Sequence, residues 1–307
     1  MIQPKWDADE LQVTSDSKRM AQYRALQSWY REIELKVPPG LGGPQVNRLV
    51  GSMLPEDAVA KAPRLNFLSD EIASYAARRV GEVRQANGTI EQDRLMRNML
   101  SSMPLCFNLF GHLRSVPEAA AEVLRASLKL DIARIDLIEV EWAPNPKEHL
   151  GDRTAFDAYI EYRTTTGDRG FLGVETKYTE PFSTEDYDKP RYRELTNDPR
   201  SRFKSTAYDV LRGPETNQLW RNALLALSVR ETGRFAHGHV LVVACRDDRG
   251  VEKAMSGLRA QHDRLEDLVR HVALEDLIAS FKARQDTAEW ASAFDRRYLN
   301  LEPVRER

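Results

Sequence analysis

The sequence predicts an α/β fold, and three observations lead to this prediction. Two runs rich in aromatic, aliphatic and β-branched residues, 151–163 and 169–178, flank a short polar segment containing Gly-Asp, which is the pattern of a β-hairpin. Residues 239–245 form a continuous apolar run, typical of a strand inside a sheet. Segments with apolar residues at helical spacing precede and follow these strands. We therefore expect a mixed central β-sheet flanked by helices.

The register of the hairpin decides which polar side chains meet. Side chains alternate between the two faces of a strand, so Glu175 and Lys177 share a face of the second strand. If the turn is centred on Thr166, Asp157 lies directly opposite Glu175. Opposed side chains have Cβ atoms only about 4.5–5.5 Å apart, and like charges there are destabilising. The two carboxylates therefore need a compensating interaction.

A divalent cation would supply this interaction, because Mg²⁺ is typically held by one or two carboxylates together with water and phosphate oxygens. The ammonium of Lys177 could hold a nucleophilic water or stabilise charge that develops on a phosphate. Two alternatives stay open. Burial could keep Asp157 protonated, or the register could slip by one residue so that the carboxylates never meet.

These residues resemble the signature of the PD-(D/E)XK nuclease superfamily, which has the restriction-endonuclease-like fold. The match consists of Asp157 and, on the next strand, Glu175-Thr176-Lys177. The surrounding segments GDRTAFDA and GVETKYTE, with LCFNLFG upstream and QLWRN downstream, resemble a bacterial restriction-endonuclease-like branch over roughly residues 90–245. Phe156 precedes Asp157, where the motif that names the superfamily has Pro. A second Glu-x-Lys, Glu34-Leu35-Lys36, lies in an expected helix and has no strand context.

The resemblance implies a role for each of these residues. Asp157, Glu175 and the main-chain carbonyl of Thr176 would hold Mg²⁺ or Mn²⁺, and Lys177 would position or help activate the attacking water. Gln218 lies in an expected helix, residues 216–230, where many superfamily members carry a polar residue that steadies the lysine or touches DNA.

A further acidic or polar ligand has three candidates. In this superfamily a helix before the first strand often supplies such a group, which points to Glu91 or Asn108. Glu141, near the end of the expected first strand at 134–142, is the third. Each has a structural alternative: a helix cap, a helix-packing amide and an edge charge that reaches solvent, respectively.

The composition is that of an ordinary globular protein, with 307 residues of which 41% are apolar and 30% charged. The net charge of −2 means that a nucleic-acid surface must be a local basic patch. Such a patch could lie at residues 189–204, within a segment from 180 to 214 that we expect to be irregular. Its basic residues are Lys189, Arg191, Arg193, Arg200, Arg202 and Lys204, and a solvated surface is the alternative.

Cysteine content and hydropathy exclude several classes. Cys106 and Cys245 are the only cysteines, too few for a disulfide framework or a cysteine-rich zinc site. The histidines show no clustering that would suit an imidazole metal site. The first residues lack the basic and apolar tandem of a signal peptide, and no apolar stretch approaches membrane-spanning length. We expect a cytoplasmic location.

Three sections are expected along the chain. Residues 1–88 form a helical N-terminal section, with helices near 16–37 and 65–85, that either caps the core or reads DNA. Residues 89–250 form the nuclease-like core, which opens with a helix at the capping box Thr89–Gln92. Residues 251–307 supply C-terminal helices that pack on this core.

The preferred function is a Mg²⁺-dependent deoxyribonuclease, an endonuclease of a restriction or defence system. A catalytically silent DNA-binding or regulatory protein is the main alternative, and RNA as the substrate is a second. A glycosidase with Asp157 and Glu175 as its carboxylate pair is disfavoured because nothing indicates an aromatic sugar-binding cleft. A homodimer would suit double-strand cleavage. Sequence specificity, endonucleolytic or exonucleolytic attack and partner proteins cannot be read from these residues.

Overall fold

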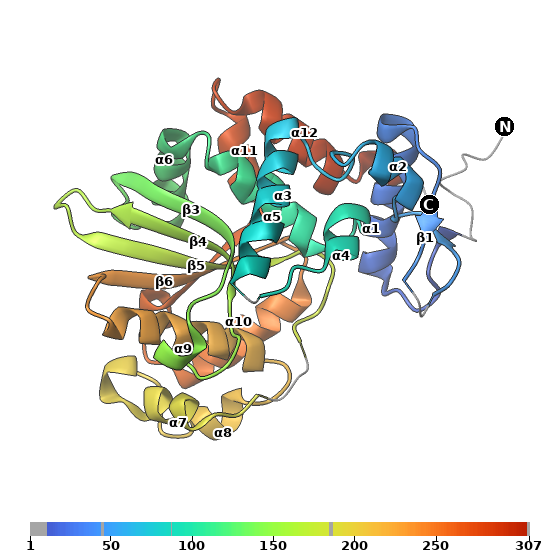
Figure 1. Ribbon diagram of the computed structural model, residues 1–307. Coiled ribbons are helices and arrows are strands. Elements are labelled where there is room, and N and C mark those ends of the chain that lie inside the picture. Colours follow the sequence, from blue (N-terminus) through green and yellow to red (C-terminus); the bar gives the residue numbers. More distant parts are fainter. Residues whose placement is uncertain (1–10, 44–45, 87, 184–186, 306–307) are drawn as a thin grey trace. The chain divides into compact units, whose positions relative to one another are not determined.

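The computed structural model describes residues 11–43, 46–86, 88–183 and 187–305 and divides the chain into two compact units (Figure 1). The first unit comprises Met1–His112 and Ile278–Arg307, and the second comprises Leu113–Leu277. Residues 89–112 therefore group with the N-terminal section, and residues 251–277 group with the core. Residues 1–10, on which the expectation about a signal peptide rests, lie outside the described residues.

A mixed five-stranded sheet forms the centre of the second unit, as the sequence predicts. Its strands lie in the order β3-β4-β5-β6-β7. The first three pair antiparallel, whereas β6 and β7 run parallel to β5. Their bounds are β3 Arg134–Trp142, β4 Phe156–Arg163, β5 Arg169–Lys177, β6 His237–Ala244 and β7 Val269–Ala273. The strand β7 corrects the sequence analysis, which predicts helix throughout this C-terminal region.

The β4–β5 hairpin has the predicted register. Arg163 pairs with Arg169 and Tyr159 pairs with Gly173. The last pair of this ladder is Ala158 with Val174. Beyond it, the Asp157 carboxylate accepts a hydrogen bond from the Thr176 N–H. The turn has an odd number of residues, which fixes the pairing of the two strands, and a register shifted by one residue is excluded.

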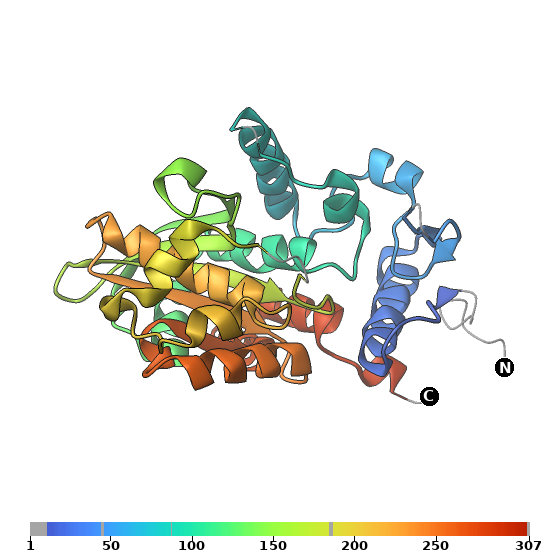
Figure 2. The same ribbon diagram turned by 90° about the horizontal axis from the view of Figure 1, so that it is seen from below.

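Helices cover both faces of this sheet (Figures 1 and 2). The helix α9 packs on β5 and β6, α7 packs on α9, and α6 contacts β3 and β7. The bounds are α6 Pro117–Leu128, α7 Pro190–Asn197, α8 Ala207–Leu211, α9 Asn217–Glu231 and α10 Arg249–Gln261, with 3-10 turns at Pro146–Glu148, Pro199–Ser201 and Leu265–Asp267. Helix α11, Leu274–Lys282, starts in this unit and ends in the first. The segment from 180 to 214 is therefore partly helical rather than irregular, and its residues 184–186 lie outside the described residues.

The apolar core of the second unit explains why α9 is hydrophobic around most of its circumference. Trp220 and Leu224 are fully buried, as are Phe171 of β5 and Val240 of β6. One side of α9 faces the sheet and another faces α7, so little of its surface meets solvent. A polar side chain on such a helix is buried and needs a partner.

The first unit is mainly helical. Its elements are α1 Lys18–Trp29, a π-helical turn at Tyr30–Leu35, β1 Gly40–Leu41, β2 Leu49–Val50, α2 Glu56–Lys61, α3 Asp70–Gln85, α4 Gln92–Arg97, α5 Ser102–Leu113, whose last residue begins the second unit, α12 Ala288–Tyr298 and a 3-10 turn at Glu302–Val304. The capping box expected at Thr89 is wrong, because α4 starts after Glu91, which makes no side-chain capping bond. Across the described ranges, no helix is both long and apolar enough to cross a membrane.

Candidate active site

Glu175 lies near the C-terminal end of β5, where its carboxylate is held by three side chains. It is only 2% exposed. Gln218 Nε2 donates to Oε1 at 2.6 Å, and Asn222 Nδ2 donates to Oε2 at 2.6 Å. Lys177 Nζ lies 3.0 Å from Oε1. Strand β5 and helix α9 together fix the orientation of this carboxylate.

Lys177 is a buried cation with well-defined neighbours. It is 6% exposed, and its Nζ also donates to Gln218 Oε1 at 3.2 Å and lies 4.5 Å from the centre of the Phe182 ring. Burial lowers the pKa of Lys177, but the carboxylates of Glu175 and Asp157 outweigh it and raise this pKa above its ordinary value. The side chain is therefore a charged donor at neutral pH.

Asp157 lies at the start of β4, where burial and neighbouring carboxylates disfavour its charged form. The main-chain N–H of Thr176 donates to its Oδ2 at 2.7 Å. Burial, followed by the carboxylates of Glu175 and Glu141, raises the pKa of Asp157 well above its ordinary value, and Lys177 only partly opposes this. Without a further cation, Asp157 therefore tends to bind a proton.

Of the three candidates for a further ligand, Glu141 is the one that acts on Asp157. It lies on β3 between the residues that pair with Ala158 and Phe156. Its backbone is left-handed, with φ 56°, which is uncommon for a residue other than glycine. Its charge contributes to the raised pKa of Asp157.

The other two candidates belong to the first unit. The amide of Asn108 is fully buried and bonded: it accepts from the Leu68 N–H, donates to the Asn66 carbonyl and donates to the Tyr298 hydroxyl. Glu91 is exposed in front of α4. Asn108 therefore has the structural role of a packing amide.

The candidate site offers carboxylate oxygens, which suit a hard divalent cation. In the part of the chain that the structure describes, no three His, Cys, Asp or Glu side chains are grouped so as to hold a metal ion. However, Mg²⁺ usually takes only one or two protein carboxylates and keeps several waters. Asp157 and Glu175 meet that requirement, and the raised pKa of Asp157 reflects burial and neighbouring negative charge, both of which a cation would offset.

Helix α9 supplies the polar side of the site. Gln218 and Asn222 are four residues apart and therefore share a face of the helix. The sequence resemblance points to Gln218, and the structure shows it bonded to both Lys177 and Glu175. The sequence analysis does not single out Asn222, although an asparagine one turn after Gln218 in a largely apolar helix is a recognisable signal.

The loop that leaves β5 closes over the start of α9. The Ser183 N–H donates to Gln218 Oε1 at 2.7 Å, and Asn217 Nδ2 donates to the Tyr187 carbonyl at 3.3 Å. The ring of Phe182 lies beside Lys177. This loop therefore restrains Gln218 and shields the lysine from solvent.

Three of the six basic residues at 189–204 form ion pairs within the chain. Arg191 is paired with Glu194 and Glu231, Arg200 with Asp198, and Arg202 with Asp267. Arg193 stacks on the Tyr208 ring, and Lys204 Nζ donates to the Ala260 carbonyl. The stretch is therefore a weaker candidate for a phosphate-binding surface than its sequence indicates.

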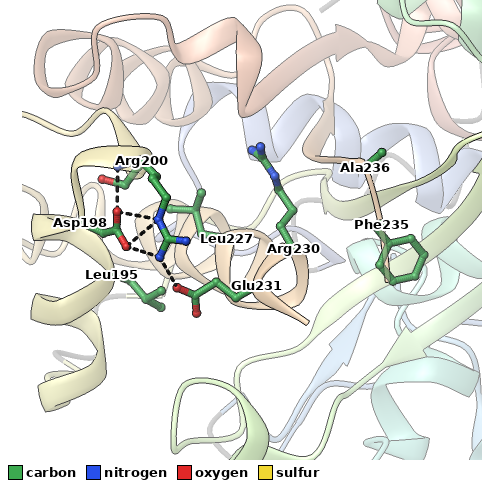
Figure 3. Close-up of a pocket in the computed structure, with 9 residues that line it drawn as sticks. Leu195, Asp198, Arg200, Leu227, Arg230, Glu231, Phe235 and Ala236 are labelled. Carbon is green, nitrogen blue, oxygen red and sulfur yellow. Dashed lines mark hydrogen bonds and ion pairs between the residues drawn. The ribbon is translucent and has the colours of Figure 1, made fainter. Parts of the chain in front are cut away.

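A cavity of about 220 Å³ lies at the other end of α9 from Gln218 (Figure 3). It is lined by Leu195, Asp198, Arg200, Ser201, Leu227, Arg230, Glu231, Phe235 and Ala236. The twelve residues from Gln218 to Arg230 correspond to roughly 18 Å of helix. This cavity is therefore separate from the carboxylate site.

A mixed sheet whose central hairpin carries Asp157, Glu175 and Lys177 beside a buried polar helix face defines a restriction-endonuclease-like α/β protein. A family model of the PD-(D/E)XK nuclease superfamily matches residues 14–300, and the chain belongs to this superfamily. Its nucleases typically use divalent metals. Searches of curated proteins and of solved structures returned no match.

Proposed function

We propose that this protein is a metal-dependent nuclease that hydrolyses phosphodiester bonds of DNA. The observation that carries the proposal is the buried contact of 3.0 Å between Lys177 Nζ and Glu175 Oε1, next to Asp157. Two acids and a lysine at the end of a central hairpin form a donor set that can support metal-assisted phosphodiester hydrolysis. Membership of a nuclease superfamily supports the same reaction class.

In this proposal, residues of the β4–β5 hairpin hold the metal and the attacking water, and a residue of α9 restrains their positions. Asp157, Glu175 and the Thr176 carbonyl would hold Mg²⁺ or Mn²⁺, which when bound lowers the pKa of water and neutralises phosphate charge. Lys177, as a protonated amine, holds the attacking water or donates to a phosphate oxygen as charge develops there. Gln218 restrains the positions of both Glu175 and Lys177.

The finer features of the function follow from the restriction-endonuclease-like resemblance. DNA is the preferred substrate, cleavage is internal, and a restriction or defence role in the cytoplasm suits both. A two-fold dimer would bring two copies of a single-strand-cutting site to one duplex. RNA is retained as an arm of the test because its backbone carries the same phosphodiester.

The test is cleavage of supercoiled plasmid, linear DNA and RNA in Mg²⁺, Mn²⁺ or EDTA. We expect cleavage that requires the metal and falls by about 100-fold or more in Glu175→Gln and in Lys177→Met. Glu161→Gln is the matched control, because Glu161 is also a β4–β5 hairpin carboxylate but pairs with Arg169 instead of Lys177. Activity that survives in both site variants would contradict the proposal.

A catalytically silent nuclease fold is the second candidate, and one observation favours it. Three donors, from Gln218, Asn222 and Lys177, already occupy the Glu175 carboxylate. A silent protein would bind DNA without cleaving it and would show no Mn²⁺ binding that depends on Glu175. Titration of wild type and Glu175→Gln with Mn²⁺ separates the two functions.

A further inference from the structure

Arg221 of α9 is held in a fixed position beside the site. It lies one turn after Gln218 and directly before Asn222. Its Nε and Nη2 atoms donate to Thr154 Oγ1 at 3.2 and 3.0 Å. Its guanidinium lies 4.1 Å from the centre of the Tyr187 ring. Thr154 precedes β4 and Tyr187 follows β5, so the segments flanking the two strands of the site clamp this arginine.

The positive charge of Arg221 has no ion-pair partner among the described residues, in contrast to Arg191, Arg200 and Arg202. Asp152 is near enough for its pKa to respond to Arg221, but its oxygens accept bonds from the Tyr192 hydroxyl and the Thr154 N–H. Thr154 is itself a neutral acceptor.

Two features make this guanidinium suitable for an oxyanion. It is only partly buried, so a ligand can reach it. Its two bonds to Thr154 use Nε and one Nη2 hydrogen, and no described acceptor is bonded to Nη1. Because arginine has five N–H donors in a rigid fork, the remaining ones present a preorganised pair to a phosphate. The orientation is already fixed, so less side-chain entropy is lost on binding.

We propose that Arg221 binds a backbone phosphodiester of the nucleic-acid substrate, next to the one that is cleaved. The inference rests on the proposed nuclease function and adds a substrate-binding residue to it. Gln218 and Arg221 are three residues apart, roughly 4.5 Å along the helix axis. The scissile phosphate beside Lys177 and a flanking phosphate on Arg221 are therefore contacts of one strand. Arg221 contributes affinity and register and carries no sequence preference.

Binding can be measured apart from cleavage in the Glu175→Gln protein, using fluorescence anisotropy with a short DNA duplex and the matching RNA duplex over a range of salt concentrations. We expect Arg221→Gln in this background to weaken binding about 10-fold and to reduce the salt slope by about one unit, as for the loss of one phosphate contact. Arg221→Lys should retain the slope because it retains the charge. If Arg221→Gln weakens binding of the RNA duplex and not of the DNA duplex, the result supports the phosphate-binding role of Arg221 and assigns RNA as the substrate.

Arg230→Gln is the matched control. Arg230 lies on the same helix, nine residues further on, is exposed, and Figure 3 draws no interaction for its guanidinium. We expect it to leave the salt slope unchanged. A second variant, Thr154→Val, keeps the charge of Arg221 and removes its anchor, so affinity should fall while the slope persists.

The inference is overturned if Arg221→Gln in the Glu175→Gln background binds with the same affinity and salt slope as the Glu175→Gln protein. The proposed nuclease function is then unaffected. A lower melting temperature with an unchanged slope also overturns the inference, because it assigns Arg221 a purely structural role. The proposed function itself is overturned if neither the Glu175→Gln protein nor the wild type binds nucleic acid and the wild type cleaves none.

Discussion

At the scale of single residues, Asn222 shows how the site depends on a side chain that does not touch the reacting groups. It is buried on a helix that is largely apolar. Its Nδ2 donates to Glu175 Oε2, the oxygen that neither Lys177 nor Gln218 contacts. Asn222 therefore helps to fix the rotation of the Glu175 carboxylate about the Cγ–Cδ bond.

Replacing Asn222 by Ala should lower Mn²⁺ affinity by about 10- to 100-fold, the range typical of residues that orient a metal ligand. The same change leaves a buried carboxylate oxygen without its donor, which costs roughly 1–3 kcal/mol of folding stability. Isothermal titration with Mn²⁺ measures the first effect and thermal unfolding the second.

The matched control for Asn222 is Asn217→Ala. Asn217 is also a buried asparagine of α9, but its Nδ2 donates to the main-chain carbonyls of Tyr187 and Arg212. It should lose stability and keep Mn²⁺ affinity. Equal Mn²⁺ affinity in the Asn222→Ala and Asn217→Ala variants would show that Asn222 does not orient the Glu175 carboxylate for metal binding.

At the scale of elements, the hairpin was predictable because an odd turn and a strict alternation leave one register. Strand β3 was predictable from its own alternation. In contrast, β7 has only five residues, two of them Arg270 and His271, and it pairs with β6 alone. An edge strand this short carries no periodic signal of its own, and its stability comes from a neighbour far away in the sequence.

The local alternation also fails at the start of β4, where tertiary packing outweighs it. Alternation places Phe156 and Tyr159 on opposite faces, yet both rings stack on Trp142, with centroid distances of 5.7 and 4.3 Å. Trp142 follows the left-handed Glu141, where the regular backbone of β3 is interrupted. The sequence contains no sign of this interruption, since left-handed residues other than glycine cannot be recognised by type.

Gly173 of β5 lies under the Phe156 ring, and this contact gives a stability prediction. A Cβ at Gly173 would lie 2.3 Å from Phe156 Cζ, and the buried ring has little room to move. Gly173→Ala should therefore destabilise the protein by about 1–3 kcal/mol through overpacking. Gly81→Ala, in the interior of α3 where nothing lies within 4 Å of the added carbon, should instead gain about 0.5–1 kcal/mol. Chemical denaturation of both variants provides the measurement, and destabilisation of similar size in the two would contradict the packing argument.

At the scale of the whole molecule, the chain returns to its first unit after completing the second. In the first unit, Gln27 Nε2 donates to the Arg297 carbonyl at 2.7 Å, and Asn108 Nδ2 donates to the Tyr298 hydroxyl at 2.7 Å. These bonds join residues separated by 270 and 190 positions. Patterns of local periodicity cannot indicate such pairings, so the sections read from the sequence differ from the units of the structure.

Each unit contains a histidine that burial holds neutral. In the first unit, burial lowers the pKa of His112, which stacks on Trp290, to about 4. In the second, burial, with help from Arg270 and Arg230, lowers the pKa of His239 to about 4. Unfolded histidine titrates near 6.5, so between about pH 6.5 and 4 the unfolded chain binds more protons than the folded one. The stability from each histidine is therefore complete above about pH 6.5 and is lost as the pH falls towards 4.

The loss reaches at most about 3 kcal/mol for His239 and is smaller for His112, which is more exposed to solvent. The raised pKa of Asp157 acts in the opposite direction, so the informative quantity is the difference between variant and wild type. We expect His239→Leu and His112→Phe each to gain stability relative to wild type as the pH falls from 6.5 to 4.5, measured by urea denaturation at several pH values. Curves parallel to that of wild type in both variants would show that neither histidine contributes to the acid sensitivity of the fold.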